Sequence, residues 1–188
     1  MKRVVITFGR FNPPTTGHEK LLNAVKRVAG TDDYKIYTSH SQDKKGKNPL
    51  PSDVKVDFMK HMFPDHKDSI MYDNKLKTII HVLQSLQGEY ADVTLVVGSD
   101  RVTEMDSLIQ KYNEKEYTFR KLETVSAGER DPDADDVSGM SASKMRKAIA
   151  EMDMVTFDSG LPSAFKKNKT KVKELFKAVR ENLPEAMK

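Results

Sequence analysis

Apolar runs rich in β-branched residues alternate along this chain with segments whose apolar residues recur every three to four positions. "VVITF" at 4–8 is the first such run, and Leu21, Val25 and Val28 follow it at helical spacing. "DVTLVVGSD" at 92–100 is continuous enough to predict a central strand covered on both faces. Strands that alternate with helices need crossover connections, which makes neighbouring strands parallel. The pattern therefore predicts an α/β fold with a Rossmann-like, doubly wound parallel sheet.

The remaining segments follow the same alternation. Further strands are expected at 33–40 and 118–126, with a short one at 69–72. Helices are expected from their apolar spacing at 54–62, 76–86, 102–112, 140–153 and 172–179. We expect a single domain over 1–188, with its core in about 1–150 and a helical C-terminal cap in about 151–188.

Composition narrows the class of protein. The 188 residues are 37% hydrophobic and 32% charged, a mixture typical of a folded globular chain. No apolar run approaches the roughly 18 residues that a membrane span needs, so we expect a cytoplasmic protein without a membrane partner. The chain has no cysteine, which excludes disulfides, thiolate zinc sites and cysteine nucleophiles. The net charge of +4 suits nucleotide phosphates, nucleic acid or solubility alone.

The loop "GRFNPPTTGH" at 9–18 joins the first strand to the first helix. A helix N-terminus offers unpaired N–H groups and the positive end of a dipole, and Gly9 would let a ligand approach the backbone. His18, in the first helical turn, can donate to a phosphoryl oxygen where charge develops. The alternative is an ordinary strand-to-helix turn that carries an incidental histidine.

A second helix start has similar chemistry. "MSASKMR" at 140–146 places Ser141 and Ser143 at a helix N-terminus with Arg146 one turn along. Hydroxyls, free N–H groups and a guanidinium can converge there on one phosphate. Serine caps are common, but two anion-binding helix ends in one parallel sheet suit a triphosphate.

Other polar segments allow two interpretations each. Asp100 either binds a ribose hydroxyl, a base edge or a hydrated metal, or caps the helix that follows. The lysines of "DKKGK" either bind phosphate or belong to a solvated loop; these are Lys44, Lys45 and Lys47. The acidic loop 129–136 lacks the spacing of a calcium loop, so a solvated acidic loop, which could serve as a mobile lid, is the better interpretation.

Several enzyme classes are excluded by missing motifs. The chain has neither G-x-x-x-x-G-K-[ST] nor G-x-G-x-x-G, which argues against a P-loop NTPase and against a dinucleotide-binding Rossmann domain. No Ser-His-Asp order can be defended.

Both helix starts match a known family. "GRFNPPTTGH" resembles the H-x-G-H signature loop of the nucleotidylyltransferase superfamily, and "SASKMR" resembles its second signature, I-S-S-T-x-x-R. Thr15 stands where the first signature histidine is usual, as it does in eukaryotic members. Met140 replaces the isoleucine, and Ser143 keeps the hydroxyl of the signature threonine.

Within the superfamily the chain is most similar to archaeal-type nicotinamide mononucleotide adenylyltransferases. Ser41-Gln42 followed by Asn48-Pro49-Leu50 resembles their second-strand loop, "VVGSD" their glycine-x-aspartate segment, and "FDSGLP" the stretch after the second signature. The resemblance implies attack by a mononucleotide phosphate on the α-phosphate of ATP, with Mg²⁺ and release of pyrophosphate. Nicotinamide mononucleotide would give NAD.

The same resemblance implies a set of site residues. His18, Arg146 and Thr15 would carry catalysis, with His18 stabilising charge on the triphosphate. Gly9, Arg10, Phe11 and Gly17 would line the nucleotide, and Ser141 and Ser143 would hold its phosphates with Arg146. The second substrate would lie by Lys47 and Asn48, with Asp100 near a nucleoside group. The resemblance implies no side chain of the protein as a metal ligand.

Alternatives on the same fold are a cytidylyltransferase or an adenylyltransferase for pantetheine phosphate or a flavin. A different class is a non-catalytic protein that binds nucleotides or nucleic acid. Thr15 and a run of five lysines at 166–173 would motivate it, but aromatic residues for base stacking are absent from that run, so a solvated helix face is preferred. The oligomeric state, including a homo-oligomer, is left open.

Overall fold

The computed structural model describes residues 2–43, 46–128 and 140–188, and its chain divides into two compact units. The sheet unit comprises Met1–Gly9, Leu21–Ser39 and Ser69–Arg130, and the helical unit comprises Arg10–Lys20, His40–Asp68 and Asp131–Lys188. Lys44, Lys45 and the acidic loop lie outside the described residues. That the units make a single domain stays a prediction.

The sheet unit contains a parallel sheet, as the alternation predicted. Its described strands lie in the order β2-β1-β3-β4, and all three pairings are parallel. Ile6 of β1 lies opposite Lys35 of β2 and Leu95 of β3, so β1 is a central strand. The strands are β1 (Lys2–Gly9), β2 (Asp33–Thr38), β3 (Tyr90–Val97) and β4 (Lys121–Ser126).

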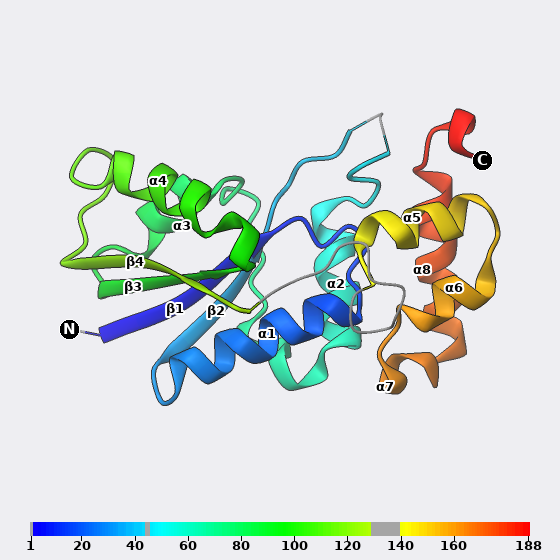
Figure 1. Ribbon diagram of the computed structural model, residues 1–188, viewed down its shortest axis with the longest axis horizontal. Helices are drawn as coiled ribbons and strands as arrows, with labels where there is room; N and C mark the ends of the chain where they lie inside the picture. The colour runs from blue at the N-terminus through cyan, green and yellow to red at the C-terminus, as the bar shows by residue number, and fades with distance from the viewer. Residues whose placement is uncertain (1, 44–45, 129–139) are drawn as a thin grey trace. The chain divides into compact units, whose positions relative to one another are not determined.

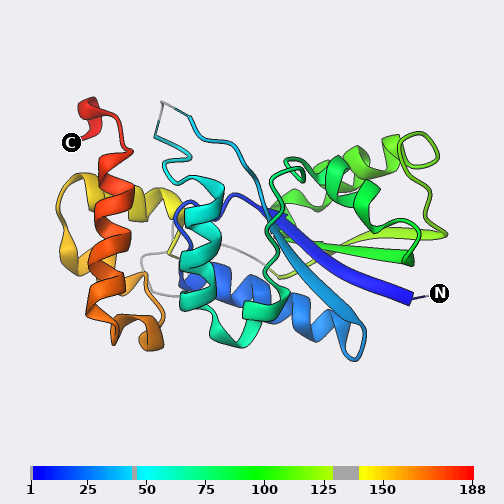
Figure 2. The ribbon, with the colours of Figure 1, turned by 180° about the vertical axis from the view of Figure 1, so that it is seen from behind.

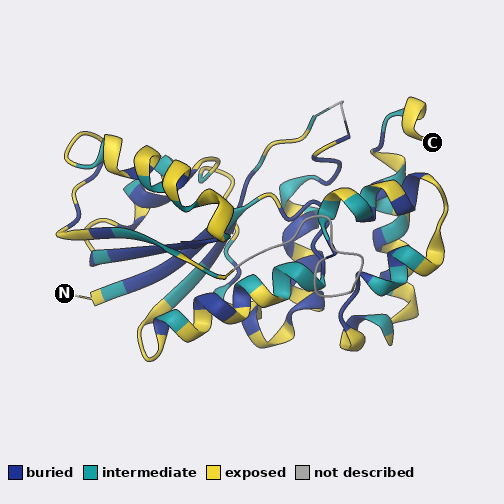
Figure 3. Cartoon of the chain, viewed as in Figure 1, coloured by how far each residue is buried: buried dark blue, intermediate teal, exposed yellow. Residues whose placement is uncertain are grey.

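Helices cover both faces of this sheet (Figure 1). Val4 and Ile6 of β1 pack in one apolar cluster with α3 (Ile79–Leu86) and α4 (Val102–Tyr112). Val5, between them, packs in a second cluster with Val25 of α1 (Thr16–Ala29). Successive side chains of a strand point to opposite faces, so one uninterrupted apolar run serves both layers. β3 is buried over most of its length, and β1 is buried at its centre, residues 4–7 (Figure 3).

Two expectations for this unit were wrong in detail. The segment 69–72 forms no strand. Its first residue still belongs to the 3₁₀ helix η1 (Pro64–Ser69), and the segment makes a single bridge, Ile36 to Ile70. The helix expected from residue 76 begins at Ile79, because Thr78 caps it by accepting a hydrogen bond from the N–H of His81 at 3.2 Å. A short 3₁₀ helix, η2 (Ser99–Arg101), follows β3.

The helical unit carries the C-terminal helices and the first turn of α1. Inside it α5 packs against α6 and α8, while α7 packs against α8 and α2 (Figure 2). Val172, Leu175 and Val179 form the buried stripe of α8. Its elements are α2 (Ser52–Met62), η1 (Pro64–Ser69), whose last residue belongs to the sheet unit, α5 (Ala142–Ala150), α6 (Met154–Ser159), α7 (Ser163–Lys166), α8 (Lys169–Glu181) and η4 (Glu185–Met187). Within the described ranges, no helix combines the length and apolar character that crossing a membrane requires.

Candidate active site

The loop after β1 is held by backbone and amide hydrogen bonds inside the helical unit. The side chain of Asn12 is fully buried, and its Oδ1 accepts the N–H of Leu50 at 2.9 Å while its Nδ2 donates to the Leu50 carbonyl at 3.4 Å. Phe11, also buried, has a φ of 47°, a left-handed conformation that costs a residue with a side chain about 1–2 kcal/mol. The contacts of Asn12 therefore help to keep the loop in a shape it would not adopt alone.

His18 lies in the first turn of α1 with a defined ring orientation. The backbone N–H of Thr15 donates to His18 Nδ1 at 3.0 Å, and the ring of Phe11 lies at 4.8 Å between centroids. Because Nδ1 acts as an acceptor, the neutral imidazole carries its proton on Nε2. This tautomer is the one that can donate from Nε2 to an anionic oxygen.

Thr15 connects the two signatures. Its hydroxyl donates to the Met140 carbonyl at 3.0 Å, directly before α5, and accepts the N–H of Gly17 at 3.2 Å. The single hydroxyl proton is therefore used, so the 3.4 Å contact between Oγ1 and His18 Nδ1 is not a donation from Thr15. The residue is 1% exposed, which favours a structural role for its hydroxyl. A role in turnover stays a prediction.

The second signature begins α5 as its serine predicted. Ser141 is the N-cap, and its hydroxyl accepts the N–H of Lys144 at 3.1 Å. Ser143 is exposed one residue into the helix. Arg146 is half-buried, and its Nη1 donates to the Asn12 carbonyl at 2.8 Å, so α5 holds the first loop as well.

Two cations lie close enough in this unit to interact. Burial lowers the pKa of the Arg146 guanidinium, the charge of Arg10 lowers it further, and the carboxylate of Asp43 opposes both. Arginine stays charged in proteins, so the pair repels. An anionic ligand between Arg10 and Arg146 would relieve that repulsion.

The loop 40–50 contributes a carboxylate that sequence reasoning missed. Asp43 accepts the N–H of Lys47 at 3.1 Å and Nδ2 of Asn48 at 2.9 Å. Asn48 is buried, and in the described part of the chain no donor meets its Oδ1. Lys47 is exposed. Asp43 follows the Ser41-Gln42 pair directly, and that adjacency was the available signal.

Gly9 and Asp100 belong to the sheet unit and are described there. Gly9 ends β1, and its carbonyl accepts the N–H of Ser39 at 2.9 Å. Asp100 is exposed in η2. The alternative in which Asp100 caps the next helix is wrong, because α4 begins at Val102 after Arg101, and no side chain caps it.

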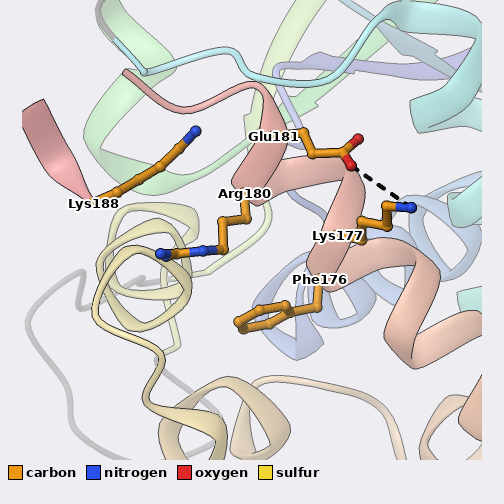
Figure 4. A pocket seen from close by; sticks show the side chains of 5 residues that line it. All are labelled: Phe176, Lys177, Arg180, Glu181 and Lys188. Atoms are coloured by element: carbon orange, nitrogen blue, oxygen red, sulfur yellow. Dashed lines mark ion pairs between the residues drawn. The ribbon is translucent and has the colours of Figure 1, made fainter. Parts of the chain in front are cut away.

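A pocket on α8 contains none of the predicted site residues. It has a volume of about 320 Å³ and is lined by Phe176, Lys177, Arg180, Glu181 and Lys188 (Figure 4). Lys177 and Glu181 form an exposed ion pair at 3.8 Å, and Arg180 donates to two carbonyls at the end of α5. Arg180 thus connects α8 to the end of α5.

Comparison with known proteins agrees with this architecture. A family model described as cytidylyltransferase-like matches residues 6–148. A probable nicotinate-nucleotide adenylyltransferase of Sulfurimonas denitrificans is 24% identical over 110 residues, covering 56% of this chain and 60% of that protein. The match thus spans less than two thirds of the relative.

A solved structure is similar in fold. Thermotoga maritima TmcAL, bound with alpha-thio ATP, has a TM-score of 0.57 at 12% identity over 93% of this chain and 56% of that one. This likeness supports the fold alone. Since the family model covers well over half of the residues, the chain belongs to the cytidylyltransferase-like family, which confirms the predicted nucleotidylyltransferase superfamily.

Proposed function

We propose that the protein is a nucleotidylyltransferase that moves AMP from ATP to the phosphate of a mononucleotide. The observation that carries the proposal is the gathering, in one unit, of a histidine whose neutral tautomer donates from Nε2 and two arginines, Arg10 and Arg146, close enough for their charges to interact. Such a set binds and stabilises a polyphosphate.

The reaction follows from these groups. A phosphate oxygen of the mononucleotide attacks the α-phosphorus of ATP, the bond from that phosphorus to the bridging oxygen breaks, and pyrophosphate leaves with the electron pair. Nucleotidyl transfer needs positioning and charge neutralisation more than proton transfer. His18 would donate to the triphosphate from Nε2, and Arg146, with Ser141 and Ser143, would hold the departing phosphates.

Magnesium enters this proposal as part of the substrate. Within the described ranges, no three or more acidic or histidine side chains lie close enough together to hold a metal ion. Mg²⁺ keeps several waters and is commonly carried by substrate phosphates, so the ion would arrive with ATP.

For the acceptor we propose nicotinamide mononucleotide. The Asp43-organised loop, with Lys47 and the buried Asn48, would lie by that substrate. The name of the Sulfurimonas relative, a probable nicotinate-nucleotide adenylyltransferase, supports a pyridine mononucleotide. A second candidate is a cytidylyltransferase, which the name of the matching family favours.

One assay separates these candidates. Purified protein is incubated with Mg²⁺, either ATP or CTP, and nicotinamide mononucleotide, nicotinate mononucleotide, pantetheine phosphate or flavin mononucleotide, and pyrophosphate is measured. We expect release with ATP and nicotinamide mononucleotide. Release only with CTP would replace the adenylyl donor, and ATP binding without turnover on any acceptor would support a non-catalytic binding protein.

A further inference from the structure

Lys55 is a buried cation that the proposed mechanism does not use. It lies on α2, in the face that also buries Met59 and Met62, and its side chain is 0% exposed. Lysine is almost never fully buried unless it is paired, because removing an ammonium from water is costly. Burial lowers the pKa of Lys55 to about 8. A residue kept at this cost calls for a specific contact.

That contact is with the signature loop at 9–18. Lys55 Nζ donates to the carbonyl of Arg10 at 2.6 Å, a short hydrogen bond from an ammonium to the backbone. Arg10 as a residue is exposed, while its carbonyl is held by Lys55 of α2. The bond joins α2 to the loop that follows β1.

Holding this carbonyl also aims an N–H group. The carbonyl of Arg10 and the N–H of Phe11 belong to one planar trans peptide unit, in which the two groups point in opposite directions. A donor that fixes the Arg10 oxygen toward α2 therefore points the Phe11 N–H away from α2. Asn12, the residue after Phe11, is held by its hydrogen bonds with Leu50 and Arg146. The Arg10–Phe11 peptide is therefore restrained from that side as well.

We propose that Lys55 is a positioning residue for nucleotide binding: its ammonium holds the Arg10–Phe11 peptide so that the Phe11 N–H faces the polyphosphate. The inference rests on the proposed function, because it takes the nucleotide to bind at this loop. Lys55 itself touches no substrate and acts through the peptide. It adds a residue on α2 to the proposed site.

The test compares Lys55→Met with Lys60→Met. Methionine keeps an unbranched buried chain but removes the donor, and Lys60 is exposed on the same helix. We expect the Kd for Mg-ATP of Lys55→Met, measured by calorimetry, to rise about tenfold or more, the usual loss for a hydrogen bond to a charged group. The melting temperature should change little, because the cost of leaving the Arg10 carbonyl without its donor is offset by removal of a buried charge. Lys60→Met should match the wild type in both.

A second measurement does not depend on the variant folding. In wild-type protein labelled with ¹⁵N-phenylalanine, the Phe11 amide resonance should shift when Mg-ATP is added. No shift in protein that binds ATP overturns the inference, as does a folded Lys55→Met with wild-type Kd. Wild-type protein that binds no nucleotide would refute the proposed function instead, so the two failures are distinguishable.

Discussion

The two units bury different kinds of polar side chain. In the described part of the sheet unit, the buried polar residues are all hydroxyls: Thr7, Thr38, Ser39 and Thr94. In the described part of the helical unit they include two amides, a lysine and a histidine, namely Asn12, Asn48, Lys55 and His66, beside Thr15.

The difference reflects the roles of the two units: the sheet unit contains an apolar core, and the helical unit holds the signature loop in place. A threonine in a strand finds a backbone carbonyl nearby, as Thr7 does at Val96 O, 2.8 Å away. Amides and ammonium groups cost more to bury and need defined partners. Asn12 pairs with the N–H and carbonyl of Leu50, and Lys55 donates to the carbonyl of Arg10. Nδ2 of Asn48 donates to the carboxylate of Asp43. A buried amide and a buried ammonium are thus the groups that hold the signature loop.

The largest expected effect is on turnover at the signature loop. His18→Ala removes the Nε2 donor and should lower kcat by about 10²–10³-fold, the usual loss for one transition-state donor. His61→Ala, an exposed histidine on α2, is the control and should keep wild-type kcat. Initial rates of pyrophosphate release measure both. An unchanged kcat in His18→Ala would falsify the role given to that residue.

The next effect is a pH dependence of stability that comes from Lys55. Its pKa falls from an ordinary 10.5 to about 8 in the folded state, so between these values the unfolded chain binds more protons than the native one. The free energy of unfolding should therefore rise as pH goes from about 8 to 10.5, by on the order of 3 kcal/mol. Urea unfolding at stepped pH measures it.

Lys55→Met should lack this rise. Subtracting its unfolding curves from those of the wild type cancels the titration of other groups, such as Tyr37, whose pKa burial raises to about 12. If wild type and variant show the same pH dependence, Lys55 is not the group responsible. Burying its ammonium would then cost less free energy than the lowered pKa implies.

A smaller effect is expected at the contact between the signatures. Thr15→Val keeps the shape but loses the bond to the Met140 carbonyl, and should lower the free energy of unfolding by about 1–3 kcal/mol. Thr15→Ser, which keeps the hydroxyl, should recover most of it. Should Thr15→Val instead retain full stability and lose turnover as far as His18→Ala, Thr15 would act in catalysis rather than as a structural contact.

The smallest effect belongs to the sheet unit. Ile6→Val deletes one methyl group in the cluster between β1, α3 and α4 and should cost about 0.5–1.5 kcal/mol of stability. Neither kcat nor the Kd for ATP should change. Thermal unfolding and calorimetry on the same sample check this. A weaker ATP Kd without lost stability would contradict the division between a core and a binding loop.

The sheet could be predicted because its signal is local in sequence. The apolar runs at 4–8 and 92–97 became β1 and β3, and the helical stripe through Val25 became α1. The segment 69–72 was the exception, since a short apolar run does not decide whether it pairs fully. Ser141 was predicted at a helix start and is the N-cap of α5.

Parts of the candidate site could not be predicted in this way. Lys55 reads as one polar residue of an amphipathic helix, and only the fold shows it buried under Arg10. Asp43 was passed over between Gln42 and two lysines, although its carboxylate orders Lys47 and Asn48. Lys55 acts through a partner 45 positions away along the chain, which no local pattern shows. The partners of Asp43 are 4 and 5 positions away, but a polar loop has no periodicity that indicates which side chains pair.

By itself, the sequence determined the fold class, the superfamily and the two signature helix starts, because each is written in neighbouring residues. Tertiary structure alone decided which side chains hold those signatures: Asn12 at Leu50, Thr15 at Met140, Arg146 at Asn12 and Lys55 at Arg10. A hydrogen bond needs a donor and an acceptor within about 3 Å. Segments distant in sequence meet that condition only when packing brings them together.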